Sequence, residues 1–335
     1  MEIFQSFQSS AGQSPESVRP TALTIGNFDG VHKGHRALLE AVTRAACRRA
    51  LVPAVLTFEP HPARVLGKGR PAPPLLTTRA DKRRLLARAG VARLIEQPFT
   101  AAWAGLTPAT FITEVLVGGL ACRHLVVGYD FVFGAGRAGD VATLQQAGPA
   151  HGFELEVVPA LGCGEAGVPS SSRIREAVER GDLDLARVLL GRPYHLHGRV
   201  IEGARRGRQL GFPTANLAVA SELVPPPGVY AGWLDVGSGP RPAAISVGDN
   251  PTFEGAALTV EAHVIASEAG APTPALDLYG RECHLAFTAR LRAQVRFSGP
   301  NALADLIERI RADVVEVRAR LAADLPPESL FDGVS

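Results

Sequence analysis

The first half of the chain alternates short apolar runs with helical patterns, and this alternation constrains the fold more than any other feature. The runs are typical of buried strands and lie at residues 23–25, 51–58, 91–95, 124–127 and 153–158. Strands that alternate with helices predict β-α-β units, which build a parallel sheet with helices on its faces. Ligands bind such open sheets at the carboxyl ends of the strands. We therefore expect an N-terminal Rossmann-like parallel α/β domain with its site at that edge.

The pattern changes from residue 192 onward, where short alternating strands follow one another without helices. They lie at residues 196–200, 230–236, 243–247, 258–265 and 283–288, separated by loops rich in proline and glycine. This arrangement predicts a small antiparallel β-barrel. Apolar residues at helical spacing between 303 and 321 predict an amphipathic C-terminal helix. We place the boundary near residue 187, which gives domains 1–187 and 188–335.

Composition excludes several classes of protein. With 335 residues, 46% of them hydrophobic, the chain can build two cores without cross-links. Its four cysteines are far apart and show no metal-ligand spacing, which argues against disulfides and a cysteine zinc site. Residues 1–20 lack a secretion signal and no apolar run is long enough to span a membrane. We expect a cytoplasmic protein with a leader that forms no regular structure.

The charge balance gives no indication of a macromolecular partner. The formal net charge is +2, from 35 basic and 33 acidic residues, so nothing attracts the chain strongly to nucleic acid. We expect small-molecule partners, with neither nucleic acid nor membrane. The sequence leaves the oligomeric state open, a homo-oligomer included.

The stretch GNFDGVHKGH, residues 26–35, links the first strand to a helix and carries chemistry. His32 and His35 lie at the helix N-terminus, where free N–H groups and the positive dipole end favour an anion. This arrangement is typical of phosphate handling. A helix terminus alone contributes about 1 kcal/mol, whereas an enzyme removes roughly 8 kcal/mol or more from a barrier. Side chains and a metal ion must therefore supply most of the stabilisation.

Three further segments of the first half have ordinary interpretations when each stands alone. Residues 134–139 form a GxGxxG match, but a Rossmann fingerprint follows the first strand and opens its helix directly, which this segment does not. The serines of SSSRIR, residues 170–175, read as a common helix N-cap. Thr78 and Asp81 have the spacing of a capping box.

The second half contains a long glycine-rich segment that ends in GFPTAN, residues 211–216. Thr214 and Asn216 alternate on an extended chain, so their oxygen atoms project to one side and suit a hard cation such as Mg²⁺. Glycines at 203, 207 and 211 allow a loop to approach phosphate closely. The alternative is a proline turn with incidental polar groups.

Two more features of the second half leave alternatives open. Glu261 is a carboxylate within an apolar strand, which is costly unless the group is functional or paired in a structural contact. His195 and His197 project from one strand face as metal ligands would, but the sequence indicates no third ligand, so we disfavour a metal there.

Taken together, these motifs resemble the bacterial bifunctional riboflavin kinase/FAD synthetase family. In the first half, GNFDGVHKGH resembles the HxGH turn of nucleotidylyltransferases, and TFEPHP, GYDFVFGAGRAGD and SSSRIR resemble further family motifs. The resemblance implies that His32, His35 and Arg175 act in adenylyl transfer. It implies that Asp130 and Phe131 contact the flavin. It also implies an ATP site formed by Gly26, Asn27, Phe28, Gly34, Ser171 and Ser172. Ser172 stands where most members carry threonine.

In the second half, residues 198–216 resemble the riboflavin kinase signature. This implies a phosphate loop of Gly203, Gly207, Arg208, Gly211, Phe212 and Pro213, with Thr214 and Asn216 as Mg²⁺ ligands. Glu261 is then the base that takes a proton from the ribityl hydroxyl of riboflavin. Residues Arg292, Phe297 and Asp313 agree with the family pattern, whereas Asn250 and Gln294 depart from it.

The resemblance implies a two-step synthesis of FAD. Riboflavin is phosphorylated by ATP to FMN, and FMN is adenylylated by ATP to FAD with release of pyrophosphate, both steps with Mg²⁺. Two other hypotheses remain: a chain that retains one activity, and a flavin or nucleotide sensor without turnover.

Overall fold

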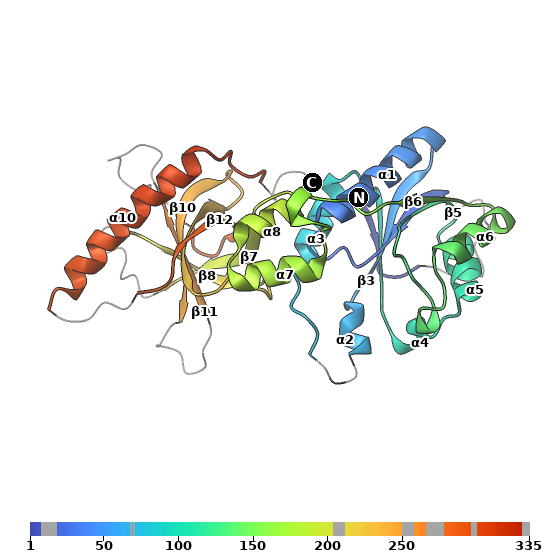
Figure 1. Ribbon diagram of the computed structural model, residues 1–335, viewed down its shortest axis with the longest axis horizontal. Coiled ribbons are helices and arrows are strands. Elements are labelled where there is room, and N and C mark those ends of the chain that lie inside the picture. The colour runs from blue at the N-terminus through green and yellow to red at the C-terminus, as the bar shows by residue number, and fades with distance from the viewer. Residues whose placement is uncertain are drawn as a thin grey trace. The chain divides into compact units, whose positions relative to one another are not determined.

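The computed structural model describes most of the chain as two compact units (Figure 1). The described residues are 1–7, 19–67, 69, 71–203, 212–249, 258–265, 278–295 and 300–329. The first unit comprises Met1–Pro73 and Lys82–Pro169, and the second comprises Pro74–Asp81 and Ser170–Ser335. A short segment from the first half of the sequence thus packs with the second unit. The functional boundary near residue 187 stays a prediction.

The first unit contains a six-stranded parallel sheet in the order β1-β4-β3-β2-β5-β6. Its strands are β1 (Glu2–Phe4), β2 (Thr21–Ile25), β3 (Val52–Phe58), β4 (Arg93–Gln97), β5 (Cys122–Gly128) and β6 (Glu154–Val158). The parallel α/β architecture predicted from the sequence is confirmed. The leader prediction was wrong at one point, because residues 2–4 add an edge strand beside β4.

Helices cover both faces of this sheet. They are α1 (Lys33–Arg49), α2 (Pro62–Leu66), α4 (Ala101–Ala104), α5 (Pro108–Thr110), the π-helix η2 (Phe111–Gly119), the 3₁₀ turns η3 (Ala135–Arg137) and η4 (Gly164–Ala166), and α6 (Val141–His151). Leu23 and Ile25 of β2 pack with Phe111 of η2 in one core. Ala22 packs with Val42 of α1 on the other face. Burial on both faces explains why the parallel strands are apolar throughout.

The second unit is a closed antiparallel barrel in the order β10-β11-β8-β7-β12-β9. Its strands are β7 (Tyr194–Ile201), β8 (Ala215–Val219), β9 (Gly228–Asp235), β10 (Arg241–Asp249), β11 (Leu258–Val264) and β12 (Glu282–Arg292). The barrel prediction is confirmed, although the sequence did not indicate β8. Helices α7 (Ser171–Arg180) and α8 (Leu183–Leu190) also belong to this unit, while α3 (Arg79–Arg88) begins in it and continues into the first.

The C-terminal helix α10 (Ala302–Ala322) packs on the barrel through its second half. Val317 and Leu321 are buried against Trp233 and Ala286. Leu303, which the sequence placed on the same helix face, is 58% exposed. The apolar face of α10 therefore extends beyond the part of the helix that packs on the barrel. Within the described residues, no helix has both the length and the apolar character that crossing a membrane requires.

Candidate active sites

The strand order of the first unit creates a switch point between β2 and β5. From β2 the chain goes to β3 and β4 on one side, then returns to β5 and β6 on the other. Because β2 and β5 are parallel neighbours, residues 26–35 and the loop from Gly128 both emerge at the same sheet edge. Open α/β sheets bind ligands at such points. The topology therefore brings together two of the predicted motifs.

The turn at this edge holds two histidine rings against each other. His32 is the N-cap of α1, and its Nδ1 accepts a hydrogen bond of 3.3 Å from the His35 backbone N–H. The two rings stack with centroids 3.7 Å apart and planes 17° apart. A Cβ at Gly34 would lie 3.2 Å from the His32 ring, so glycine leaves room for this ring beside the helix. His32 is buried and His35 is half-buried.

The residues before the histidines fix the shape of the turn. The backbone N–H of Gly26 donates to the Leu56 carbonyl (3.1 Å), and the Thr57 hydroxyl donates to the Asn27 carbonyl (3.1 Å), which ties the turn to β3. Phe28 has a positive φ of 50°, a strained conformation for a bulky residue. Its fully buried ring lies 5.0 Å from His35, so a contact of Phe28 with ATP would be made by its backbone.

The loop after β5 presents the predicted flavin contacts. Asp130 is exposed, and Phe131 is half-buried with its ring stacked on Phe133 at 5.8 Å. The GxGxxG segment folds back on itself, because Phe133 and Gly139 form an antiparallel bridge. A Cβ at Gly139 would lie 2.6 Å from the Phe133 ring. Gly139 therefore packs closely inside a loop that folds back on itself.

The serine-arginine motif opens α7 in the second unit. The Ser170 hydroxyl caps the helix by accepting from the Arg173 N–H at 3.4 Å, and Ser171 and Ser172 are its first two residues. Arg175 is buried, and its Nε donates to the Pro74 carbonyl at 2.8 Å. The convergence of this motif with His32 stays a prediction.

The barrel carries a row of polar side chains across three strands. Asn216 on β8 lies opposite Glu261 on β11, which in turn lies opposite Ser246 on β10. Residues directly opposite in a sheet point to the same face. Gln294 extends the row, since its Nε2 donates to the Ser246 hydroxyl at 2.8 Å. The predicted base and one predicted Mg²⁺ ligand thus lie side by side.

Close packing and one histidine position the GFPTAN segment at this row. A Cβ at Gly203 would lie 2.1 Å from Asn216 Nδ2, so the glycine backbone rests on that amide. His263 on β11 donates from Nδ1 to the Pro213 carbonyl at 2.9 Å, and its ring meets Phe212 edge-on at 5.6 Å. Burial lowers the pKa of His263, which favours the neutral imidazole. The predicted residues Gly207, Arg208 and Gly211, with Asn250 and Phe297, lie outside the described residues.

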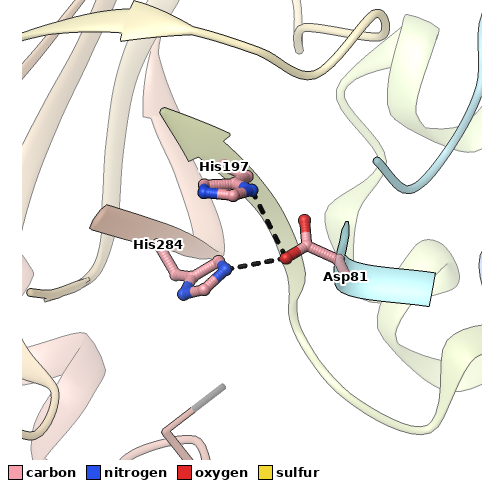
Figure 2. A group of neighbouring side chains, drawn as sticks. All are labelled: Asp81, His197 and His284. Atoms are coloured by element: carbon pink, nitrogen blue, oxygen red, sulfur yellow. Dashed lines mark hydrogen bonds and ion pairs between the residues drawn. The ribbon is translucent and has the colours of Figure 1, made fainter. Parts of the chain in front are cut away.

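A third cluster, which the sequence did not indicate, joins Asp81 to three histidines of the barrel. Figure 2 shows the rings of His197 and His284 turned toward the Asp81 carboxylate. The nearest contact, from His284 Nε2 to Asp81 Oδ1, is 2.8 Å. Burial raises the pKa of Asp81, but its interactions with His195 and His284 outweigh burial and hold that pKa far below the usual range. Burial lowers the pKa of His195 to about 4.

The cluster was missed because it depends on strand register. His284 lies opposite His197 in the β7–β12 pair, and Asp81 arrives from the segment 74–81. The predicted capping box is present only in part. The Thr78 hydroxyl accepts from the Asp81 N–H at 3.1 Å, while it donates to the Asp81 carboxylate at 2.8 Å. No spacing in the sequence links residues 81, 197 and 284.

Comparison with known proteins agrees with both halves of this description. A family model for FAD synthetase matches residues 14–172, and one for riboflavin kinase matches residues 190–321. A bifunctional riboflavin kinase/FMN adenylyltransferase of Escherichia coli (strain K12) is 39% identical over 289 residues, 86% of this chain and 89% of that protein. The chain belongs to the bifunctional riboflavin kinase/FMN adenylyltransferase family.

Other relatives extend the match. The riboflavin kinase/FMN adenylyltransferase of Bacillus subtilis (strain 168) is 32% identical over 314 residues, 91% of this chain and 95% of that protein. A solved chain from Streptococcus pneumoniae, described as a macrolide-efflux protein, aligns with a TM-score of 0.80 and 27% identity, covering 95% of this chain and 98% of that one. The similarity to riboflavin kinase/FMN adenylyltransferases therefore extends over 86–91% of this chain.

Proposed function

We propose that this chain makes FAD from riboflavin in two steps, each at its own site. The first step transfers the γ-phosphoryl group of ATP to riboflavin, and the second transfers the adenylyl group of ATP to FMN. The observation that supports the proposal is the position of one motif from each set within the fold. The histidine turn lies at the switch point of the parallel sheet, and Asn216 lies opposite Glu261 in the barrel.

In the kinase step, Glu261 takes the proton of the ribityl hydroxyl as the hydroxyl oxygen attacks the γ-phosphorus and ADP leaves. A general base must lie within hydrogen-bond reach of that proton, and the half-buried Glu261 carboxylate faces the same side of the barrel as Asn216. Thr214 and Asn216 would hold Mg²⁺, since both offer neutral oxygen donors and the close approach of the Gly203 backbone fixes the Asn216 amide in place. The ion would neutralise phosphate charge.

In the adenylyl step, a phosphate oxygen of FMN attacks the α-phosphorus of ATP in line, and pyrophosphate leaves. Because His32 Nδ1 accepts from the His35 N–H, the neutral ring carries its proton on Nε2. That N–H can donate to a phosphate oxygen where charge builds up in the transition state. We assign Arg175 and the hydroxyls of Ser171 and Ser172 to the phosphates that leave, and Asp130 and Phe131 to the flavin.

The remaining parts of the proposal concern organisation. We assign adenylylation to residues 1–187 and the kinase to residues 188–335, with Gly26, Asn27, Phe28 and Gly34 forming the ATP turn. The loop with Gly203, Phe212 and Pro213 approaches the phosphates of the kinase reaction. We place the enzyme in the cytoplasm with small molecules as its partners.

Product analysis tests the function directly. Purified protein is incubated with riboflavin, ATP and Mg²⁺, and the flavins are separated by chromatography over time. We expect FMN to appear first and FAD to follow. FMN without FAD, or FAD only from supplied FMN, would show that one activity alone is present. Flavin binding without any phosphorylated product would favour the sensor hypothesis and refute ours.

A further inference from the structure

The cluster around Asp81 lies outside the residues that we assign to either reaction, and it gathers side chains that could bind a metal ion. Asp81 closes the segment 74–81, while His195 and His197 alternate on β7 and His284 lies opposite His197 on β12. Alternate and opposite residues share one sheet face, so all three imidazoles project to the same side. We propose that Asp81, His195, His197 and His284 form a structural site for a divalent transition-metal ion of the zinc class.

Two of the three separations in the cluster suit a shared ion better than a hydrogen bond, whereas the third, from His284 Nε2 to Asp81 Oδ1, is a hydrogen bond of 2.8 Å. His197 Nδ1 lies 3.5 Å from Asp81 Oδ1, and His195 Nε2 lies 3.6 Å from Asp81 Oδ2. Both distances exceed the length of a good hydrogen bond. Ligand atoms about 2.0–2.1 Å from a tetrahedral Zn²⁺ stand roughly 3.4 Å apart. The ligand atoms of Asp81, His197 and His284 all lie within 4.8 Å of one another, so small side-chain rotations would complete the tetrahedron.

His195 supplies an independent indication of a ligand. Its side chain is 94% buried, and Nε2 makes no hydrogen bond with any residue that the structure describes, although it lies 3.6 Å from the Asp81 carboxylate. Burying such a nitrogen without a partner is costly. A metal bond to Nε2 would remove that cost, and it would make His195 the fourth ligand.

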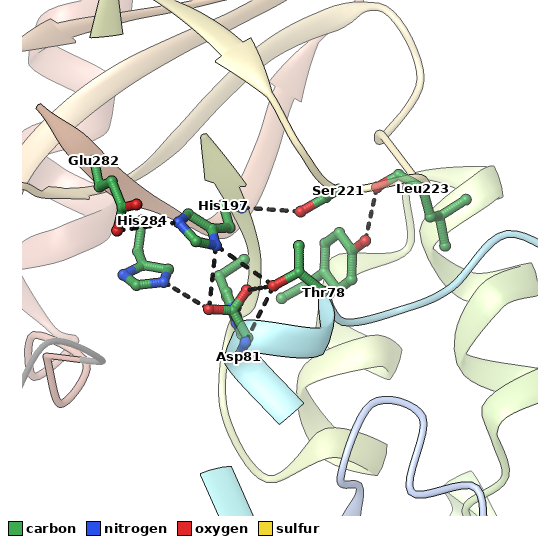
Figure 3. Close-up of polar contacts among 9 residues, drawn as sticks. Thr78, Asp81, His197, Ser221, Leu223, Glu282 and His284 are labelled. Atoms are coloured by element: carbon green, nitrogen blue, oxygen red, sulfur yellow. Dashed lines mark hydrogen bonds and ion pairs between the residues drawn. The ribbon is translucent and has the colours of Figure 1, made fainter. Parts of the chain in front are cut away.

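The surroundings of His197 also resemble those of a metal ligand. Its Nδ1 faces Asp81, and its other nitrogen, Nε2, lies 3.8 Å from Glu282 Oε2. Metal-binding histidines commonly present the second ring nitrogen to a carboxylate. Figure 3 shows this arrangement, with the His197 backbone N–H bound to the Ser221 hydroxyl at 2.9 Å. Glu282 itself is half exposed.

The donor set defines the class of ion and its role. Three imidazoles and one carboxylate suit Zn²⁺ and related ions, whereas Mg²⁺ prefers oxygen ligands. Four protein ligands leave no open position for substrate, which is typical of a structural rather than a catalytic site. The ion would hold the segment 74–81 to strands β7 and β12. This inference does not depend on the proposed activities.

Metal binding to the full-length protein tests the site. Chelator-treated protein is titrated with Zn²⁺ in excess Mg²⁺, and the affinity is measured by competition with a chromophoric chelator. The variants are Asp81→Asn and His284→Gln. The matched control is His124→Gln on β5, since His124 is a buried imidazole whose Nε2 lies 3.1 Å from a carboxylate oxygen of Glu156.

We expect one Zn²⁺ per chain, a loss of affinity of at least about 100-fold in both cluster variants, and no change in the control. Absence of stoichiometric binding, or equal affinity in wild type and cluster variants, would overturn the proposal. Should a variant fail to fold, the absorption spectrum of Co²⁺ bound to the wild-type chain tests the proposal instead. Visible absorption bands of four-coordinate cobalt support the site, and the weak spectrum of six-coordinate cobalt refutes it.

Discussion

Replacing Gly203 by alanine tests the kinase site at its tightest contact. A Cβ at this position would lie 2.1 Å from Asn216 Nδ2, whereas real Cβ contacts essentially never fall below 3.0 Å. Either Asn216 or the loop must therefore move by about 0.9 Å or more. A misplacement of about 1 Å in a catalytic site costs on the order of 100-fold in rate. We expect Gly203→Ala to lower the rate of FMN formation by about that factor.

The assay follows FMN formed from riboflavin and, separately, FAD formed from supplied FMN. The rate of FAD formation should stay unchanged, because we assign the adenylyl site to other residues. Gly162→Ala is the control, since a Cβ at Gly162 would meet no atom of the described residues within 4 Å. If the glycine acts through Asn216, the double variant Gly203→Ala/Asn216→Ala should lose no more than Asn216→Ala alone. A Gly203→Ala enzyme with normal kinase turnover, or strictly additive losses, would refute the reasoning.

Three further substitutions test other parts of the structure. Asp313→Ala removes the buried carboxylate that forms a two-pronged ion pair with the half-buried Arg292 guanidinium, and it should lower the free energy of unfolding, measured in urea, by roughly 3 kcal/mol. An unchanged urea midpoint would contradict this. Burial lowers the pKa of His263 in the folded chain below its ordinary value of 6.5. As the pH falls, the unfolded chain therefore binds a proton at His263 before the folded chain does. The contribution of His263 to the free energy of unfolding should thus be constant above about pH 6.5 and decrease below it. His263→Gln, which can still donate to Pro213, should flatten that loss, and an equal slope would exclude His263 as its source. Phe131→Ala should raise the KM for FMN in adenylylation while riboflavin phosphorylation is unaffected; an unchanged KM would remove Phe131 from the flavin site.

The fold could be predicted from the sequence where local pattern determines it. The first half alternates strands with helices, and its strands are apolar throughout because both faces of a parallel sheet are buried. The second half has strands without helices, a pattern typical of an antiparallel sheet that packs one face on the core. Strand β8 escaped notice because residues 215–219 directly follow the GFPT run, which reads as a loop. Strand β1 is exposed and only three residues long, too short for any periodicity.

The sites, like the fold, could be predicted only where their residues are close together in the sequence. The His32–His35 turn and the GFPTAN segment are continuous in sequence, so residue types and spacing indicated their chemistry directly. The Asp81 cluster is not continuous in sequence. It depends on the strand register that sets His284 opposite His197, and on the packing of segment 74–81 on the barrel. Likewise, the alternation of Thr214 and Asn216 was visible, but the pairing of Asn216 with Glu261 required the strand order.

Complementation between two variants that each lack one activity tests the central claim, that two separate sites act in succession. His35→Ala should convert riboflavin to FMN and stop there, whereas Glu261→Gln should convert supplied FMN to FAD but leave riboflavin unchanged, each lost step being slowed at least about 100-fold. Mixed in one tube with riboflavin, ATP and Mg²⁺, the two variants should together produce FAD through free FMN. Formation of FAD from riboflavin by either variant alone, or no FAD from the mixture, would contradict the account.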